Sequence, residues 1–454
     1  MTDRPVLALA DVGGRDMSVV GPKAARLGEL IGAGFPVPDG VVLTVDVHRT
    51  ALAAAGVAEQ VAAGVADLIE RVGDAGDLDQ RVAALREVAG RAEMSVGHRS
   101  ALLAAYRSLT SGDADAGGIG PAVAVRSSAI GEDTEDASFA GTYDSVTDVV
   151  GADAVLAAVG VCWSSSVSTR SIAYRAGMAR QPSGVSDPAM AVIVQRMAPS
   201  QRSGVMFTVD PRAAVDRLVI EAVGAGGSVV SGGSDPERFE VDRTSGIIVE
   251  ATRPSDDRDP SATSAPVLSH AEVAALNELG RSIEDHFGTP QDVEWTIGSD
   301  GSIWIVQSRP ITGRPATGPG SATPGAGGTI PTSGSSGAEP PWDDPDAVLT
   351  GTGASAGTAR GLARVLRSPG DAPDLLDGEV LVAPTTSPEW MPALMRAAAV
   401  VTDTGGMASH AAIVARERRI PCVVGVAGAT ERLVDGEVVT VDGSAGTVSR
   451  STRS

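Results

Sequence analysis

The stretch AAAVVTDTGGMASHAAIVARERRIPCVVG, residues 397–425, predicts the fold of the C-terminal part of the chain. It begins as an apolar strand, passes through a Gly-Gly pair, forms a helix over 410–418 and returns to a strand after Pro421. Ser409 lies where an N-cap is expected, so His410 would stand in the first helical turn. A helix N-terminus would favour a neutral, nucleophilic imidazole and could then help to hold a phosphate attached to it.

The loop before this helix fits a histidine that carries an anion. Gly405 and Gly406 would let the backbone approach a bulky anionic group, and Thr402 ends the preceding strand. The other four histidines, at positions 48, 98, 270 and 286, are expected to lack such a setting. His410 is therefore the candidate catalytic residue, and the supporting residues are Thr402, Gly405, Gly406 and Ser409. The alternative for any single Ser-His pair is a solvated histidine at a helix start.

The same region resembles a known family over nearly all of residues 345–450. TDTGGMASHAAIVARERRIPCVVG resembles the phosphohistidine signature of the PEP-utilising enzymes, which include PEP synthase, pyruvate phosphate dikinase and rifampicin phosphotransferase. VLVAPTTSPEWMPALMRAAAVVTDTGG (380–406) and GTGASAGTARGLARV (351–365) are similar to earlier parts of the same swivelling domain. The resemblance implies a small β/β/α phosphohistidine domain in which His410 is the phosphorylated residue.

Helix and strand signals alternate along the whole chain, which predicts an α/β protein. Residues 22–33 place apolar side chains on one helical face with Pro22 in the first turn, and the Ala-rich residues 50–110 read as helices. Strands are expected at 122–128, 189–197, 217–223 and 302–310, and in the C-terminal region at 379–383, 398–402, 422–426 and 437–441.

The beginning of the chain resembles the start of an ATP-grasp domain in the same enzymes. The similar stretch is VGPKAARLGELIGAGFPVPDGVVLT (20–44), and it holds Lys23, the single lysine among 36 basic residues. The resemblance implies that Lys23 contacts ATP phosphates. This chain has Gly21-Pro22-Lys23 where the family usually has Gly-Gly-Lys, so one backbone N–H is lost at Pro22.

A second block, AVRSSAIGEDTEDASFAGTYDSV (124–146), is similar to the phosphate-binding part of that domain. By position, Arg126 is the phosphate-binding arginine, and its guanidinium presents a donor fork suited to phosphate. Ser138, Gly141 and Thr142 would lie in the loop that closes over the triphosphate.

Two further blocks follow in the order found in the family. In IVQRMAPSQRSGVMFTVDP (193–211), Gln195 and Met197 fall where the adenine-binding strand lies. In IEAVGAGGSVVSGGSDPERFEV (220–241), the family's usual Gly-Leu-Gly-Glu is replaced by Gly-Ala-Gly-Gly. The acidic position is lost, and Glu221 is the nearby candidate for its role.

The last block, QDVEWTIGSDGSIWIVQSRPIT (291–312), reads as two antiparallel strands joined by a Gly-rich turn. This arrangement would place Glu294 and Gln307 side by side, and the resemblance implies that they bind the metal. Oxygen ligands of this kind suit Mg²⁺. Arg309 matches a phosphate-contacting arginine, and Asp292 shares the strand face of Glu294 as a supporting partner.

The most distinct boundary in the chain is GRPATGPGSATPGAGGTIPTSGSSGAEP (313–340), in which 25 of 28 residues are Gly, Pro, Ser, Thr or Ala. Such a composition predicts a flexible linker. The expected domains are an ATP-grasp region over 1–312 with subdomains at about 1–190 and 191–312, a linker over 313–342, and the swivelling domain over 343–454.

Composition excludes several classes of function. A net charge of −21 argues against nucleic acid and a polybasic membrane anchor as partners. No apolar run approaches the ~18 residues of a membrane helix, and no signal peptide is evident. Two cysteines far apart in sequence suit a reducing cytoplasm. Aromatic residues make up only 3%, so the cores must be built from Val, Ala, Leu and Ile.

Taken together, these blocks predict an ATP-dependent phosphotransferase of the dikinase type, similar to PEP synthase (pyruvate, water dikinase). It would phosphorylate its own His410, release AMP and pass phosphate to a small-molecule acceptor. No acceptor-binding module is recognisable, so the acceptor would bind between the two domains or on a partner subunit. Two alternatives stay open: a phosphohistidine relay or regulatory protein without turnover, and an ATP-grasp ligase that does not need His410.

Overall fold

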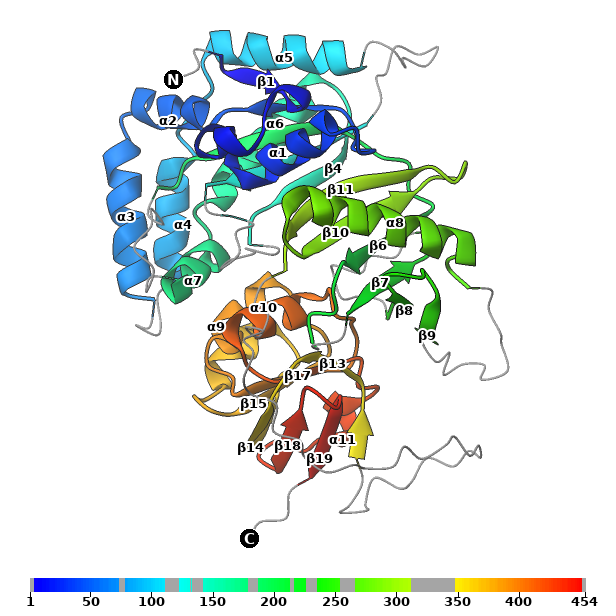
Figure 1. Ribbon diagram of the computed structural model, residues 1–454. Coiled ribbons are helices and arrows are strands. Elements are labelled where there is room, and N and C mark those ends of the chain that lie inside the picture. Colours follow the sequence, from blue (N-terminus) through cyan, green and yellow to red (C-terminus); the bar gives the residue numbers. More distant parts are fainter. Residues whose placement is uncertain are drawn as a thin grey trace.

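The computed structural model describes residues 4–72, 78–110, 122–130, 132, 142–178, 187–212, 216–225, 235–253, 266–311 and 348–450. They form a mixed α/β structure with three sheets, which confirms the predicted fold class at that level (Figure 1). The predicted linker lies outside the described residues.

The first sheet has the strand order β1-β2-β5-β3-β4, with antiparallel pairing throughout. Because strand side chains alternate between faces, Val42 and Ile193 pack with helix α1 while Val41 and Val192 pack with helix α6. The strands are β1 (Val6–Ala8), β2 (Gly40–Leu43), β3 (Val123–Ala129), β4 (Ser145–Val149) and β5 (Met190–Arg196). The helices around it are α1 (Met17–Gly32), α2 (Val45–Ala54), α3 (Ala58–Glu70), α4 (Leu78–Ala89), α5 (Val96–Thr110), α6 (Ala152–Ser165) and α7 (Thr169–Met178).

The second sheet has the order β11-β10-β6-β7-β8-β9 and is also antiparallel. One face, including Met206 and Leu218, packs under helix α8. The other face, including Val205 and Phe207, packs against the C-terminal region. Its elements are β6 (Arg202–Phe207), β7 (Arg217–Val223), β8 (Glu237–Asp242), β9 (Ile248–Thr252), α8 (His270–Phe287), β10 (Gln291–Ile297) and β11 (Ile303–Pro310).

The C-terminal sheet has the order β12-β19-β18-β14-β15-β16-β17-β13. Strands β14 to β17 pair in parallel, and the flanking pairs are antiparallel. One of its cores consists of Val, Ala and Leu alone, as the low aromatic content predicts. The elements are β12 (Val348–Thr350), β13 (Thr352–Ser355), β14 (Thr358–Val365), β15 (Val380–Ala383), α9 (Met391–Leu394), β16 (Ala399–Thr402), α10 (His410–Arg418), β17 (Cys422–Val424), α11 (Ala429–Arg432), β18 (Val438–Asp442) and β19 (Thr447–Arg450).

Most predicted elements fall within one or two residues of those observed, and the helix over 410–418 is confirmed at both ends. The strand expected over 422–426 ends earlier, at Val424, because Gly425 has a positive φ of 66°. Helix α1 begins at Met17, but Gly21 breaks it with φ 75° and ψ 157°. The regular part after this break therefore begins at Pro22, as predicted.

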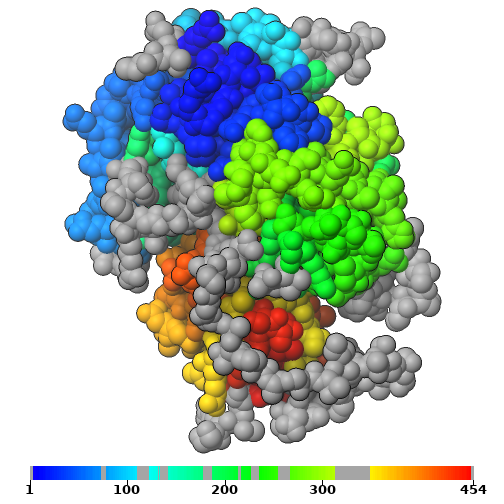
Figure 2. Space-filling view, viewed as in Figure 1, coloured from blue at the N-terminus to red at the C-terminus, as the bar shows by residue number. Residues whose placement is uncertain are grey.

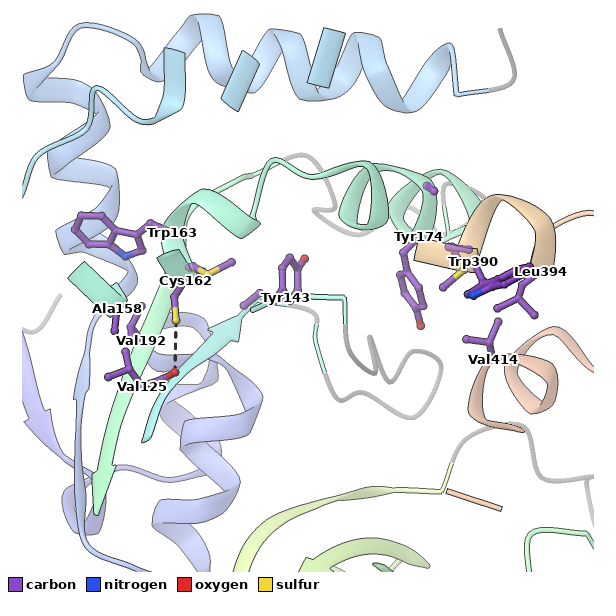
Figure 3. Packing of buried hydrophobic residues seen from close by; sticks show 14 of the residues in the cluster. Val125, Tyr143, Ala158, Cys162, Trp163, Tyr174, Val192, Trp390, Leu394 and Val414 are labelled. Atoms are coloured by element: carbon purple, nitrogen blue, oxygen red, sulfur yellow. Dashed lines mark hydrogen bonds between the residues drawn. The ribbon is translucent and has the colours of Figure 1, made fainter. Parts of the chain in front are cut away.

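The C-terminal region packs against helix α7 of the first sheet's region and against one face of the second sheet (Figures 1 and 2). Tyr174 of α7 lies among Trp390, Leu394 and Val414 of the C-terminal region, in one hydrophobic cluster with the first sheet (Figure 3). The hydroxyl of Tyr174 donates a hydrogen bond to Glu417 Oε2 at 2.9 Å. The structure therefore shows the C-terminal region docked, with apolar side chains buried at the junction.

One helical stretch of the described chain, Ala152–Ala176, has the length and hydropathy of a membrane span, with half of it buried inside the fold. It comprises α6 and α7, and Val155, Val159 and Cys162 pack into the core beside the first sheet. Its apolar character is therefore accounted for by packing within the protein.

Candidate functional site

The register of β10 and β11 brings the residues of the predicted metal site together. Glu294 lies directly opposite Gln307, so the prediction that they are side by side is confirmed. Two residues away, Asp292 lies opposite Arg309. Arg309 Nε and Nη2 each lie 3.0 Å from Asp292 Oδ2, and both side chains are buried. Asp292 is thus the direct ion-pair partner of Arg309.

Arg126 reaches from β3 of the first sheet to this hairpin of the second. Its Nη2 donates a hydrogen bond to Gln307 Oε1 at 2.7 Å and lies 3.9 Å from Glu294 Oε2. Its Nη1 donates to the carbonyl of Val306 and lies 3.5 Å from the side-chain oxygen of Gln195, on the neighbouring strand β5. The structure therefore joins four of the sequence-predicted residues across the boundary between two sheets.

Lys23 lies in α1 and is buried, with 7% of its surface exposed. Its Nζ donates hydrogen bonds to Glu132 Oε1 at 2.6 Å and to the carbonyl of Ser127 at 3.2 Å. Glu132 was not predicted as a partner, because it stands in an acidic stretch with no distinguishing pattern. A carboxylate thus holds this ammonium in place.

Gly21 explains why the chain can reach this position. A Cβ there would lie 2.4 Å from the carbonyl oxygen of Ser128, and the residue has a positive φ of 75°. Both facts require glycine. The neighbouring Pro22 begins the regular helix, so the Gly-Pro-Lys sequence builds a tight approach between α1 and β3.

The remaining predicted nucleotide-side residues are less completely described. Gly141 and Ser138 lie outside the described residues. Thr142 is buried, and its Oγ1 has no hydrogen-bond partner. Met197 lies just after β5, half-buried, and its backbone N–H donates to the carbonyl of Ala122 at 3.0 Å.

No group of three or more His, Cys, Asp or Glu side chains suited to a metal ion occurs among the residues that the structure describes. Glu294 and Gln307 alone supply one carboxylate and one amide oxygen, and Arg126 contacts Gln307. A hard cation could therefore be held here only together with other oxygen ligands. Mg²⁺ fits such a partial site, because it commonly keeps waters and shares phosphate oxygens.

His410 begins helix α10 and is buried, with 4% of its surface exposed. Its Nδ1 lies 3.2 Å from Thr386 Oγ1. Its Nε2 is buried and has no hydrogen-bond partner within the described part of the chain. Ser409 has N-cap geometry, as predicted, but its hydroxyl makes no capping bond, and none of the described residues is its hydrogen-bond partner.

The surroundings of His410 keep its imidazole neutral. Burial lowers the pKa of His410 to about 4; the charge of Glu389 opposes this shift and that of Arg170 adds to it. Arg170 belongs to α7 and forms ion pairs with Asp144 of its own region and with Glu389 of the C-terminal region, the latter at 3.2 Å. A neutral imidazole with one free ring nitrogen is chemically a nucleophile.

The loop before His410 binds two carboxylates of the second sheet's region. The backbone N–H groups of Met407 and Ala408 donate to Glu221 Oε1 and Oε2 at 2.6 and 3.0 Å. The N–H of Gly405 donates to Asp235 Oδ1 at 2.7 Å. The glycine pair was expected to admit an anion. In this structure the anionic groups at the loop are the carboxylates of Glu221 and Asp235. Thr402 instead donates within its own loop, to the carbonyl of Thr404 at 2.8 Å.

Glu221 was considered only as a substitute for a lost acid, and Asp235 was missed. Their contacts join residues 170 or more positions apart, so no local pattern could reveal them.

The statement that the other histidines lack the setting of His410 is wrong for His270. His270 begins helix α8 directly after Ser269, whose hydroxyl accepts a hydrogen bond from the backbone N–H of Glu272. His270 is exposed, however, whereas His410 is buried. The Ser-His pattern thus marks a helix start in both places, and burial distinguishes them.

Comparisons with known proteins agree with the arrangement of these regions. Residues 17–323 match the family described as "Pyruvate phosphate dikinase, AMP/ATP-binding domain", and residues 375–446 match "PEP-utilising enzyme, mobile domain". Arg126, Glu294 and Gln307 lie within the first match, and His410 lies within the second.

Curated relatives align with almost the whole chain. A "Probable phosphoenolpyruvate synthase" of Archaeoglobus fulgidus is 40% identical over 98% of this chain and 58% of that protein. One from Methanothermobacter thermautotrophicus is 36% identical, covering 96% of this chain and 62% of that protein. The "Phosphoenolpyruvate synthase" of Pyrococcus furiosus is 32% identical, covering 95% and 57%. The chain thus spans less than two thirds of each of these relatives.

Proposed function

Since the chain belongs to the PEP-utilising enzyme family, with its AMP/ATP-binding and mobile domains, we propose that it is an ATP-dependent phosphotransferase of the dikinase type. It phosphorylates its own His410, releases AMP and passes phosphate to a small-molecule acceptor, as in PEP synthase. The observation that carries this proposal is the buried, neutral imidazole of His410, whose Nε2 has no hydrogen-bond partner among the residues that the structure describes.

ATP binds in the N-terminal region, which we assign as an ATP-grasp domain with two subdomains over residues 1–312. Arg126 spans the two sheets there and, with Lys23 and Arg309, neutralises the phosphates. Each of these cations already has a carboxylate or amide partner. ATP binding therefore exchanges protein contacts for phosphate contacts. Gly141 and Thr142 cover the phosphates, and Gln195 and Met197 contact the adenine.

Mg²⁺ is the proposed cofactor, held by Glu294 and Gln307 together with phosphate oxygens. When bound, it supplies charge neutralisation on the transferring group. The protein's own part is to present the two side chains from neighbouring strands at fixed register. Asp292 orients Arg309 beside them.

His410 is the nucleophile. Nδ1 keeps its proton against Thr386 Oγ1, so the Nε2 lone pair is free to attack the β-phosphorus of ATP. A bond forms between Nε2 and the β-phosphorus. The bond between the β-phosphorus and the oxygen that it shares with the α-phosphorus breaks. AMP leaves with that oxygen, and the γ-phosphoryl group passes to water or inorganic phosphate. The phosphoryl group that remains on His410 is then transferred to the acceptor.

Transfer requires His410 to move between sites. We assign residues 313–342 as the linker to the domain over 343–454, because their Gly-, Pro-, Ser- and Thr-rich composition suits such movement. The acceptor binds on a partner subunit or in a part of the protein that the relatives contain beyond the matched region. Cys162 and Cys422 are both free and buried, which fits the reducing cytoplasm in which we place the protein.

The test is the intact mass of the protein after treatment with ATP and Mg²⁺. We expect the wild type to gain phosphoryl mass and release AMP, and His410→Ala to do neither. His270→Ala is the matched control, because His270 also follows an N-cap serine but is exposed. It should label as the wild type does. Equal labelling of His410→Ala would contradict the proposal.

A further inference from the structure

Glu221 makes an unusual contact between the second sheet and the C-terminal region. It lies in the middle of β7, opposite Val205 on one side and Arg238 on the other. Its carboxylate, 1% exposed, accepts one hydrogen bond on each oxygen, from the backbone N–H groups of Met407 and Ala408. The bound residues end two positions before His410.

The loop is shaped for this carboxylate. A Cβ on Gly406 would lie 2.6 Å from both carboxylate oxygens of Glu221, so only glycine allows the approach. Gly405 has a φ of 121° and directs its N–H to Asp235. Three backbone amides of this loop thus bind two carboxylates from the region of the second sheet.

The contact is sealed from water by apolar side chains. Met407 and Ala408 pack in one cluster with Val205, Val219 and Val223 of the second sheet. Arg416 of α10 lies over the ring of Phe207 at 5.3 Å and donates to the carbonyl of Met407 at 2.7 Å. Hydrogen bonds to a charged acceptor in such a dry setting are strong and directional.

We propose that Glu221, assisted by Asp235, is the positioning residue that docks the loop Gly405–Ala408 on the second sheet and thereby orients His410 toward the nucleotide. This inference rests on the proposed function. Because Ala408 is joined to His410 through Ser409 alone, a displacement of the bound amides also displaces the imidazole. Attack in line on a phosphorus atom is sensitive to such displacement.

Hydrogen exchange tests the docking without any phosphoryl transfer. In the unliganded full chain, we expect peptides covering 405–410 to be protected, and Glu221→Ala to accelerate their exchange about 30-fold. Glu237→Gln is the matched control. Glu237 is buried in the same sheet, but it accepts hydrogen bonds from Arg253 and from the backbone N–H of Val267, which both belong to its own region. Unchanged exchange in Glu221→Ala would overturn the inference.

Single-turnover phosphorylation tests the positioning. Glu221→Gln keeps the shape but turns an amide NH₂ toward a backbone N–H, and we expect labelling at saturating ATP to slow about 30-fold. The affinity for ATP should stay within about twofold of the wild type, because the nucleotide residues are untouched. Wild-type labelling speed in both Glu221 variants would overturn the inference. Absence of labelling in the wild type would instead contradict the proposed function, and the exchange result would still stand.

Discussion

Helices α8 and α10 begin in the same way and end up in opposite environments. Ser269 and Ser409 have nearly identical backbone angles, φ −74° and ψ 158° against φ −65° and ψ 156°, and each is followed by histidine. Ser269 forms a capping box with Glu272, and His270 is exposed. Ser409 has no capping bond, and His410 is buried. The local sequence therefore creates the helix start, while tertiary packing creates a protected nucleophile.

The largest expected difference between the two histidines is in chemical accessibility. Diethyl pyrocarbonate acylates neutral imidazoles that it can reach. We expect His410 to react about 100-fold more slowly than His270, because reaction requires the C-terminal region to open at a cost of ~3 kcal/mol. Peptide mass spectrometry after timed modification measures both rates in one sample. Equal rates would show that His410 is not protected.

Gly406→Ala should disturb the loop that precedes His410 and leave the surroundings of His270 unchanged. The added Cβ would meet the Glu221 carboxylate at 2.6 Å, and we expect labelling to slow about 30-fold, as for an overpacked contact of ~2 kcal/mol. Gly160→Ala is the control, because a Cβ on Gly160 meets nothing within 4 Å. Slowing in both variants to the same degree would point to a general loss of stability.

Acid should weaken the docked state of His410. Its pKa is lowered to about 4 by burial, whereas an exposed imidazole titrates near 6.5. The docked state thus favours the neutral form. This preference contributes to the free energy of docking. The contribution is fully present above about pH 6.5 and is lost as the pH falls toward 4.

At pH 5.5, one unit below the exposed value, we expect the opening of residues 405–410, measured by hydrogen exchange corrected for intrinsic rates, to be about tenfold more frequent than at pH 7.5. ATP binding, measured in parallel, controls for loss of the nucleotide site. An opening equilibrium that stays constant down to pH 5.5 would contradict the burial of His410 in the docked state.

The smallest expected effect concerns the two serines. Ser269→Ala should lower the free energy of unfolding by about 1 kcal/mol, because it removes a capping box. Ser409→Ala should change it by less than about 0.5 kcal/mol, because its hydroxyl has no partner to lose. Urea denaturation measures both. A larger loss in Ser409→Ala would mean that its hydroxyl contributes in a way the unphosphorylated structure does not show.

The sequence predicted what depends on short separations. Helix 410–418, the pairing of Glu294 with Gln307 and the start of the regular part of α1 at Pro22 all follow from periodicity, turns and proline geometry. It did not predict Glu132 beside Lys23 or Glu221 beside Met407, because these pairs are more than 100 residues apart. The expectation that His270 lacks the setting of His410 missed the helix start that Ser269 and His270 share with Ser409 and His410. The exposure that does distinguish the two histidines depends on tertiary packing.

Tryptophan fluorescence can report on the junction around Tyr174. Trp390 is 3% exposed and lies in that cluster with Leu394 and Val414 (Figure 3). If the C-terminal region leaves the first sheet, the indole of Trp390 loses the neighbouring side chain of Tyr174 and meets water. The emission of this one tryptophan would shift to longer wavelength. A variant in which the other four tryptophans are replaced by phenylalanine would therefore carry an optical reporter of domain movement without an added label.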